Sequence, residues 1–200
     1  MELNMKRVRY FLLISLAFIF LGLSFCLTND KIKLHLEINQ YHDRFLDIFF
    51  KNITAIGDGA FALILLPYLL CYTKSRNYFL SLSTCLVAGV LAQFFKKVIF
   101  PDMYSPIKFI PIEDLHLITG VQLHSAQAFS SVHTTSAFAF FILLAFLFAR
   151  NTVSQIIFGV LVILVGFSRI YLSQHFLADV LFGASLGIIS FFISSILINQ

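Results

Sequence analysis

The stretch Ser-Arg-Ile-Tyr-Leu-Ser-Gln-His-Phe-Leu-Ala-Asp, residues 168–179, sets an arginine, a histidine and an aspartate among almost pure hydrocarbon. Charged groups are costly near a bilayer, so such a cluster marks a candidate site. On a helix, His175 and Asp179 share one face because they lie four residues apart. A carboxylate there can hold the imidazole in one tautomer, and Arg169 adds a planar set of donors that suits phosphate.

The composition around this stretch predicts a polytopic membrane protein. The chain has 200 residues, of which 59% are hydrophobic and 12% charged, and its mean hydropathy is +0.90. Soluble domains average roughly 25% charged residues. The net charge of +4 comes from scattered basic residues. The sequence has no basic run, zinc-ligand spacing or aromatic-basic platform, so we do not expect nucleic acid as a partner.

Apolar segments long enough to span a bilayer, about 20 residues each, recur along the chain. Six segments qualify or nearly do, at 10–27, 57–73, 78–100, 131–149, 153–171 and 176–198. The fold class expected is therefore all-α, a membrane bundle of six transmembrane helices. We expect one domain over residues 1–200, with a core at about 57–198 and an uncleaved N-terminal anchor helix at 10–27.

The first long connection, from residue 28 to about 56, contains an amphipathic segment at about 42–54. Phe45, Ile48, Phe49 and Ile53 recur there at helical spacing, and charged residues such as Asp47 fall on other faces. This pattern predicts a helix on the membrane surface or beneath the bundle. The histidines at 35, 42, 116 and 124 are expected at the surface or interface, without metal-ligand spacing.

Counting membrane crossings brings the polar residues together. With the basic N-terminus in the cytoplasm, Lys74, Arg76 and Arg150 also face the cytoplasm, as the positive-inside rule prefers. The opposite, extracytoplasmic face then collects the polar residues that end or begin the last four spans. These residues are Lys96, Lys97, Ser131, His133, Arg169 and His175.

In these residues the chain resembles the type 2 phosphatidic acid phosphatase superfamily, which includes haloperoxidases. Its motifs are Lys-x6-Arg-Pro, Pro-Ser-Gly-His and Ser-Arg-x5-His-x3-Asp. The third is complete at residues 168–179, and the second appears as Ser-Ser-Val-His at 130–133. The first is degraded: a lysine and a proline remain at 96–106, with Ser105 where the arginine would stand.

The resemblance implies a metal-independent hydrolase of phosphoric esters or anhydrides, with no cofactor. His175 would attack phosphorus and form a phosphohistidine, Asp179 would orient and charge-balance it, and His133 would protonate the leaving oxygen and then activate water. The other motif residues would bind the phosphoryl oxygens. They are Lys96, Lys97, Ser131, Val132, Ser168 and Arg169.

Elementary chemistry supports these roles independently. A neutral histidine is a competent nucleophile, and a second histidine can serve as general acid. Ser131 stands at a predicted helix start, where free N–H groups attract phosphate.

The departures from the family motifs weaken the predicted site. Loss of the arginine removes a contact worth ~1.5–3 kcal/mol, on the order of 10–100-fold in rate. Val132 in place of glycine is expected either to crowd the oxyanion or to forbid a positive φ at this position.

Three functions follow from these observations. The first is an integral membrane phosphatase acting on a lipid phosphate or diphosphate, such as polyprenyl diphosphate, phosphatidate, phosphatidylglycerophosphate or lipid A phosphate. It would lie in a bacterial inner membrane with its site on the extracytoplasmic side. The second is an impaired relative that binds lipid phosphate without turnover. The third is a small transporter, although such folds tend to carry repeats and broken helices.

Overall fold

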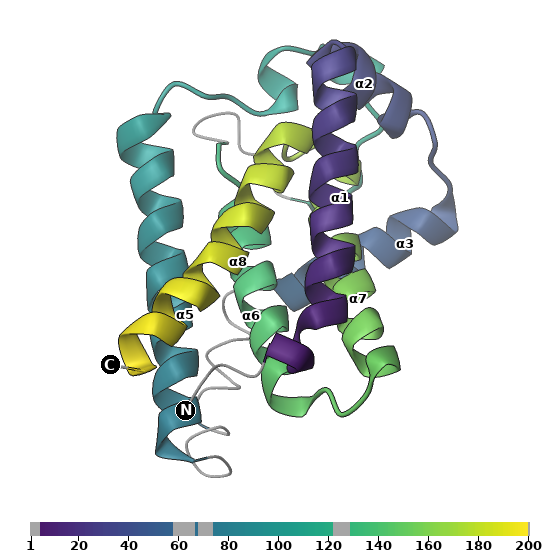
Figure 1. The fold of residues 1–200 in the computed structure, drawn as a ribbon. Coiled ribbons are helices and arrows are strands. Elements are labelled where there is room, and N and C mark those ends of the chain that lie inside the picture. The colour runs from purple at the N-terminus through teal and green to yellow at the C-terminus, as the bar shows by residue number, and fades with distance from the viewer. Residues whose placement is uncertain (1–4, 58–66, 68–73, 122–128, 200) are drawn as a thin grey trace.

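The computed structural model describes residues 5–57, 67, 74–121 and 129–199, and every regular element within these ranges is helical. Apolar helices form a bundle (Figure 1). They are α1 (Arg9–Thr28), α5 (Ser75–Phe94) with its π-helical extension η3 (Phe95–Ile99), α6 (Val132–Phe148), α7 (Thr152–Tyr171) and α8 (Leu177–Asn199). Shorter elements flank them: η1 (Met5–Arg7), α2 (Lys31–Asn39), α3 (Arg44–Ile53), η2 (Thr54–Gly57), η4 (Pro106–Lys108) and η5 (Ile112–Asp114).

Within the described ranges, four helices are long and apolar enough to cross a membrane: Arg9–Thr28, Ser75–Ile99, Thr152–Tyr171 and Leu177–Ile198. They match four of the predicted spans to within three residues at each end. The fifth, α6, is apolar but has only 17 residues. The predicted span at 57–73 lies outside the described residues except for Gly57 and Pro67, so the count of six stays a prediction.

Helix α6 lies at the centre of the bundle, where it packs against α5, α7 and α8. Its buried residues occur on every side of the helix, and Phe138, Ile142 and Leu143 are at most 2% exposed. An apolar helix with no polar face must be surrounded by other helices or by lipid. The protein therefore encloses α6 and exposes apolar surface mainly on the surrounding helices, where Phe20 and Val90 are examples.

Glycines on α8 permit its close approach to α6. A Cβ atom on Gly187 would lie 2.6 Å from both the Cβ of Phe138 and the carbonyl oxygen of Thr135. One turn earlier, a Cβ atom on Gly183 would lie 2.8 Å from the carbonyl oxygen of Ser131. Small residues at helix interfaces let backbones approach closely in membrane bundles. This packing brings the starts of α6 and α8 together.

The predicted amphipathic segment forms α3 and η2, and α3 crosses the outside of α7 (Figure 1). Phe50 and Ile53 are buried, whereas Phe45 and Ile48 are 73% and 55% exposed. Asp47, expected on a solvated face, instead bonds to other parts of the protein, as described below. The polar face of α3 is thus partly an internal contact surface, and the exposed apolar side chains are free to meet lipid.

We expect Gly187→Ala to destabilise the protein by about 1–3 kcal/mol, because the added methyl group would meet backbone atoms that cannot rotate away. Thermal unfolding in detergent measures the effect. Gly89→Ala in α5 is the matched control, because a Cβ atom at Gly89 meets nothing within 4 Å. Equal melting temperatures for both variants would contradict this account of the α6–α8 contact.

Candidate active site

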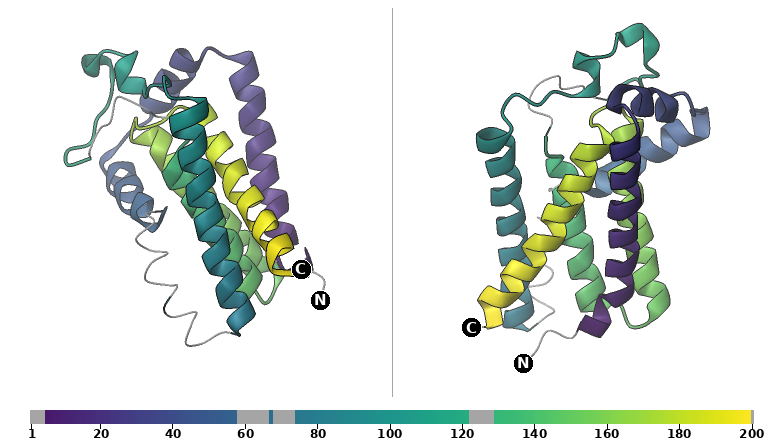
Figure 2. Two further views of the ribbon diagram at one scale, coloured as in Figure 1. Left: turned by 90° about the vertical axis from the view of Figure 1, so that its left-hand side faces the viewer. Right: turned by 45° about the horizontal axis from the view of Figure 1, so that its top comes forward.

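Four helix ends meet at one end of the bundle. Both Figure 1 and Figure 2 show that α5 ends, α6 begins, α7 ends and α8 begins at the end that also carries α2. The predicted site residues lie on these four helix ends or beside them. Among the described residues no group of three or more His, Cys, Asp or Glu side chains could hold a metal ion.

The turn between α7 and α8 carries His175. The backbone N–H groups of Gln174 and His175 both donate to the carbonyl oxygen of Arg169, at 3.0 and 3.2 Å. Ser173 adopts a left-handed conformation with φ of 54°, which non-glycine residues rarely adopt without support from their surroundings. These backbone contacts fix the spacing between the arginine and the histidine.

Asp179 connects three parts of the site. Its Oδ2 lies 3.5 Å from Nδ1 of His175 and accepts a hydrogen bond of 3.0 Å from the backbone N–H of Phe176. Because Asp179 is the third residue of α8, this second bond is half of a capping box. Its own carbonyl oxygen accepts from the backbone N–H of Ser131, at 3.3 Å. The carboxylate thus faces Nδ1 of His175 and leaves Nε2 as the nitrogen available for chemistry.

The environment of His175 favours a neutral imidazole. Burial lowers the pKa of His175, and the positive charges of Arg169 and Lys96 lower it further, against the opposing effect of Asp179. The net direction is downward. A histidine that is neutral near neutral pH keeps its lone pair for nucleophilic attack.

His133 and Arg169 meet at one residue that sequence analysis did not single out. Nε2 of His133 donates to the carbonyl oxygen of Thr54 at 2.7 Å. Nη1 of Arg169 donates to the hydroxyl of the same threonine at 2.9 Å. Thr54 lies 79 residues before His133 and 115 before Arg169, and it follows an amphipathic helix with no catalytic motif. Nothing in the sequence signals this contact.

The remaining motif residues differ in what they can offer to a phosphate. Ser131 caps α6, and its Oγ accepts from the backbone N–H of Thr134 at 3.3 Å. Val132 is the first residue of α6 and is partly buried. The hydroxyl of Ser168 donates to the carbonyl oxygen of Val165 at 2.6 Å. Its hydrogen is therefore engaged within α7 in this structure, whereas the start of α6 presents backbone donors.

The two lysines predicted to bind phosphate, Lys96 and Lys97, differ in their exposure. Lys96 is partly buried, and its charge acts on His175, whereas Lys97 is exposed. Ser105, which stands where the family has an arginine, is fully buried, and its hydroxyl has no hydrogen-bond partner among the described residues. Lys108 is exposed, with its Nζ 5.7 Å from the ring centre of Tyr104. Lys96 is therefore the lysine whose charge reaches the site.

A polar network supports the histidine turn from behind. Ser173 Oγ lies 3.1 Å from Nε2 of His35 and accepts a hydrogen bond of 3.1 Å from Asn39. The amide of Asn39 also exchanges two hydrogen bonds with the backbone of His116, at 2.7 and 3.1 Å. The side chains of α2 therefore hold Ser173, the residue with the left-handed backbone, and link it to His116 in the segment between η3 and α6.

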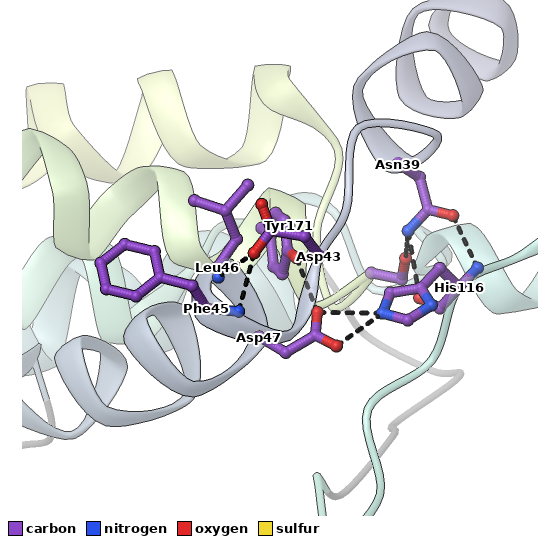
Figure 3. A network of polar contacts seen from close by, with 8 residues as sticks. Asn39, Asp43, Phe45, Leu46, Asp47, His116 and Tyr171 are labelled. Carbon is purple, nitrogen blue, oxygen red and sulfur yellow. Dashed lines mark hydrogen bonds and ion pairs between the residues drawn. The ribbon is translucent and has the colours of Figure 1, made fainter.

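Asp47 on α3 joins this network through His116 and Tyr171 (Figure 3). It accepts hydrogen bonds from Nε2 of His116 at 2.9 Å and from the hydroxyl of Tyr171 at 2.6 Å. Burial opposes ionisation of Asp47, but these two bonds hold the pKa of its carboxyl below the usual value. The ring of His42 stacks on that of His116, with 3.7 Å between ring centres.

The prediction that His35 lies at the surface or interface is wrong, because the side chain is buried within the protein. Its side chain is 2% exposed, and burial lowers its pKa to about 4. The 3.6-residue pattern of α2 turns His35 and Asn39 toward Ser173, a contact that the sequence does not reveal. His124 lies outside the described residues.

An apolar cavity of about 250 Å³ adjoins the site, with Asp179 in its wall. Leu34, Met103 and Phe176 contribute apolar surface. Lys31 lies at the same cavity, and its Nζ is 4.2 Å from the ring centre of Phe109. The cavity therefore has mostly hydrocarbon walls, and its charged lining residues are Lys31, Asp102 and Asp179.

Comparison with known proteins assigns the arrangement to a family. The model of the PAP2 superfamily matches residues 59–200. The chain belongs to the PAP2 superfamily. Among PAP2-type structures, it is similar to Aquifex aeolicus LpxE, with a TM-score of 0.70 and 27% identity over 82% of this chain and 93% of that chain.

Two Bacillus subtilis proteins provide further likenesses. Undecaprenyl-diphosphatase BcrC is 33% identical over 146 residues, 71% of this chain and 69% of its own length. Phosphatidylglycerophosphatase B is 42% identical over 77 residues, 34% of this chain and 38% of its own length. The crystal structure of a transmembrane PAP2-type phosphatidylglycerolphosphate phosphatase from the same species has a TM-score of 0.63 and 28% identity, covering 96% of this chain and 94% of that one. With its apolar helices, the chain is an integral membrane protein of this family.

If the predicted site binds phosphate, we expect Lys96→Met to lower kcat/KM for phosphate release on the order of 10–100-fold, because it removes the cation whose charge acts on His175. Lys97→Met is the matched control and should leave kcat/KM unchanged, because Lys97 points to the surface. Steady-state phosphate release measures both variants. A larger loss in the Lys97 variant would reverse this assignment.

Burial of His35 predicts a loss of stability in acid. Its ordinary pKa is 6.5 and its pKa in the folded protein about 4, so between these values only the unfolded chain takes up the proton. The free energy of unfolding should therefore fall as the pH drops through this window, by about 3 kcal/mol in total. Thermal unfolding in detergent across the window measures the effect. His35→Asn, which does not titrate, should show a shallower dependence, and identical slopes would contradict the prediction.

Proposed function

We propose that this protein hydrolyses the phosphate monoester or diphosphate of a membrane lipid through a phosphohistidine formed on His175. The observation that carries the proposal is the pairing of His175 with Asp179 at 3.5 Å, at the end of the bundle where Arg169 and His133 share Thr54. Membership of the PAP2 superfamily and likeness to two lipid phosphatases support it.

The first step transfers the phosphoryl group. Nε2 of His175 attacks phosphorus while the bond from phosphorus to the leaving oxygen breaks, and His133 donates a proton to that oxygen. Asp179 stabilises the positive charge that develops on the imidazole of His175. The dephosphorylated lipid leaves as an alcohol, or as a monophosphate when the substrate is a diphosphate.

The second step releases phosphate. His133, now neutral, takes a proton from water as the water oxygen attacks the phosphorus of the phosphohistidine. The bond from phosphorus to nitrogen breaks and its electron pair returns to His175. In both steps Arg169, Lys96 and the backbone N–H groups at the start of α6 stabilise the charge on the phosphoryl oxygens. In this proposal the cations and backbone donors stabilise the phosphoryl charge, and no metal ion takes part.

The surroundings of the site favour a lipid as substrate. The cavity of about 250 Å³ beside Asp179 has apolar walls that suit the first part of a hydrocarbon chain, and Lys31 at its edge suits an anionic headgroup. Polyprenyl diphosphate and phosphatidylglycerophosphate are the substrate classes named for the relatives. Phosphatidate and lipid A phosphate carry the same anionic group on an apolar anchor.

We also propose that the site faces the extracytoplasmic side of a bacterial inner membrane. Arg7, Arg9, Lys74 and Arg150 lie at or beside the helix ends opposite the site. Basic residues next to transmembrane segments favour the cytoplasm. The site end then opens toward the outer leaflet, where a lipid phosphate can enter sideways.

A second candidate function is binding of a lipid phosphate without turnover. The observation that favours it is Ser105: the family's arginine is absent, and the residue in its place is a buried serine. A site with one cation fewer stabilises the transition state less. Binding would then persist while hydrolysis fails.

Phosphate release from a panel of lipid phosphates in detergent tests the proposal. The wild-type protein should release phosphate from at least one member, and His175→Ala should lower the rate on the order of 1,000-fold or more, because the nucleophile is removed. Tyr41→Ala is the control, since Tyr41 is 72% exposed and lies outside the site.

The other outcomes separate the two candidates. Release that survives His175→Ala would contradict the phosphohistidine mechanism. A wild-type protein that binds a lipid phosphate but releases no phosphate from any member of the panel would favour the binding function instead.

A further inference from the structure

Thr54 occupies a special place in the site, because one residue contacts two groups that belong to different motifs. Its hydroxyl accepts from the guanidinium of Arg169 at 2.9 Å, and its carbonyl oxygen accepts from the imidazole of His133 at 2.7 Å. Arg169 ends α7 and His133 begins α6. Among the described residues, Thr54 is therefore the direct bridge between the cation and the second histidine.

The segment that carries Thr54 is built to reach the site. Helix α3 docks on α7 through Phe50, whose ring centre lies 4.5 Å from that of Tyr171 and 5.5 Å from that of Phe167. The hydrogen bond between Asp47 and Tyr171 fixes the same helix at 2.6 Å. These contacts orient α3 so that its C-terminal end, followed at once by Thr54, points into the site.

Gly57 completes this approach. A Cβ atom there would collide with Cγ1 of Val165 and would lie 3.0 Å from Cδ2 of His133. Only a residue without a side chain lets η2 lie this close to α6 and α7. The distance of Thr54 from His133 and Arg169 is thus set by packing on both sides of η2.

We propose that Thr54 is a positioning residue, which holds the guanidinium of Arg169 and the imidazole of His133 at the geometry that phosphoryl transfer requires. The inference rests on the proposed function and adds a residue from outside the family motifs to it. A carbonyl oxygen can only accept, so Nε2 of His133 carries a hydrogen. The second nitrogen, Nδ1, is then the one that exchanges a proton with the leaving oxygen and with water.

The two contacts have separable consequences. The hydroxyl orients the guanidinium, so its loss weakens binding of a phosphoryl group. The carbonyl orients the imidazole, so its displacement weakens protonation of the leaving oxygen. Each contact can be tested by a substitution at a residue outside the family motifs.

Thr54→Val tests the hydroxyl, because valine keeps the shape of threonine. We expect the affinity for orthovanadate, a phosphate analogue, to fall about 10–100-fold, with a parallel loss of kcat/KM. Thr54→Ser restores the hydroxyl and should recover most of the affinity. Thr84→Val is the control for the same substitution away from the site: Thr84 is buried, and its hydroxyl donates to the carbonyl of Leu80 within α5.

Gly57→Ala tests the carbonyl, because the new methyl group pushes η2 away from His133. The loss of kcat should be larger for an alkyl phosphate than for p-nitrophenyl phosphate, whose phenolate leaves without a proton. A purely structural defect would lower both rates equally. Gly89→Ala, which meets nothing within 4 Å, is the control.

Orthovanadate binding, read as a rise in melting temperature, needs no turnover and so separates this inference from the proposed function. If the wild-type protein binds orthovanadate but hydrolyses nothing, the proposed function fails and Thr54 is judged on binding alone. The inference is overturned if Thr54→Val binds orthovanadate as the wild-type protein does, or if the wild-type protein does not bind it.

Discussion

The carboxylate of Asp179 is the constraint on which the rest of the site depends. It caps the first turn of α8 through the N–H of Phe176 and lies 3.5 Å from Nδ1 of His175. The carbonyl of the same residue holds the N–H of Ser131 at the start of α6. A buried carboxylate is stable only where donors and positive charge surround it. The same groups that satisfy Asp179 therefore also fix His175, the proposed nucleophile, beside the start of α6.

The bundle makes this convergence possible through close helix packing. Gly183 and Gly187 let α8 approach α6 at distances that a Cβ atom would forbid. From the other side, α2 and α3 brace the turn at Ser173 and bring Thr54 to the site. At this end of the bundle, polar contacts connect the α7–α8 turn, the start of α6 and η2. The imidazole of His175 can thus be kept neutral, oriented and close to cations while the helices around it remain apolar.

Much of this architecture could be predicted from the sequence, because apolar run length and motif spacing are local properties. The described spans begin and end within three residues of their predicted positions. The four-residue spacing also predicts that His175 and Asp179 meet, although His175 lies in the turn before α8 and not on the helix. The role of Thr54, the burial of His35 and the inward turn of Asp47 could not be predicted. Each depends on a contact between residues far apart in the chain, and no local pattern distinguishes them from surface residues of an amphipathic segment.

The central claim is that the imidazole of His175 takes the phosphoryl group covalently. Rapid quenching of the His133→Ala variant with a radiolabelled phosphate ester tests it most directly, because that variant lacks the proposed base for hydrolysis of the intermediate. An ester with a good leaving group is needed, so that the first step proceeds without the general acid. The account predicts acid-labile, alkali-stable label on the protein, located by mass spectrometry at His175. Label on any other residue, or turnover without labelled protein, would contradict it.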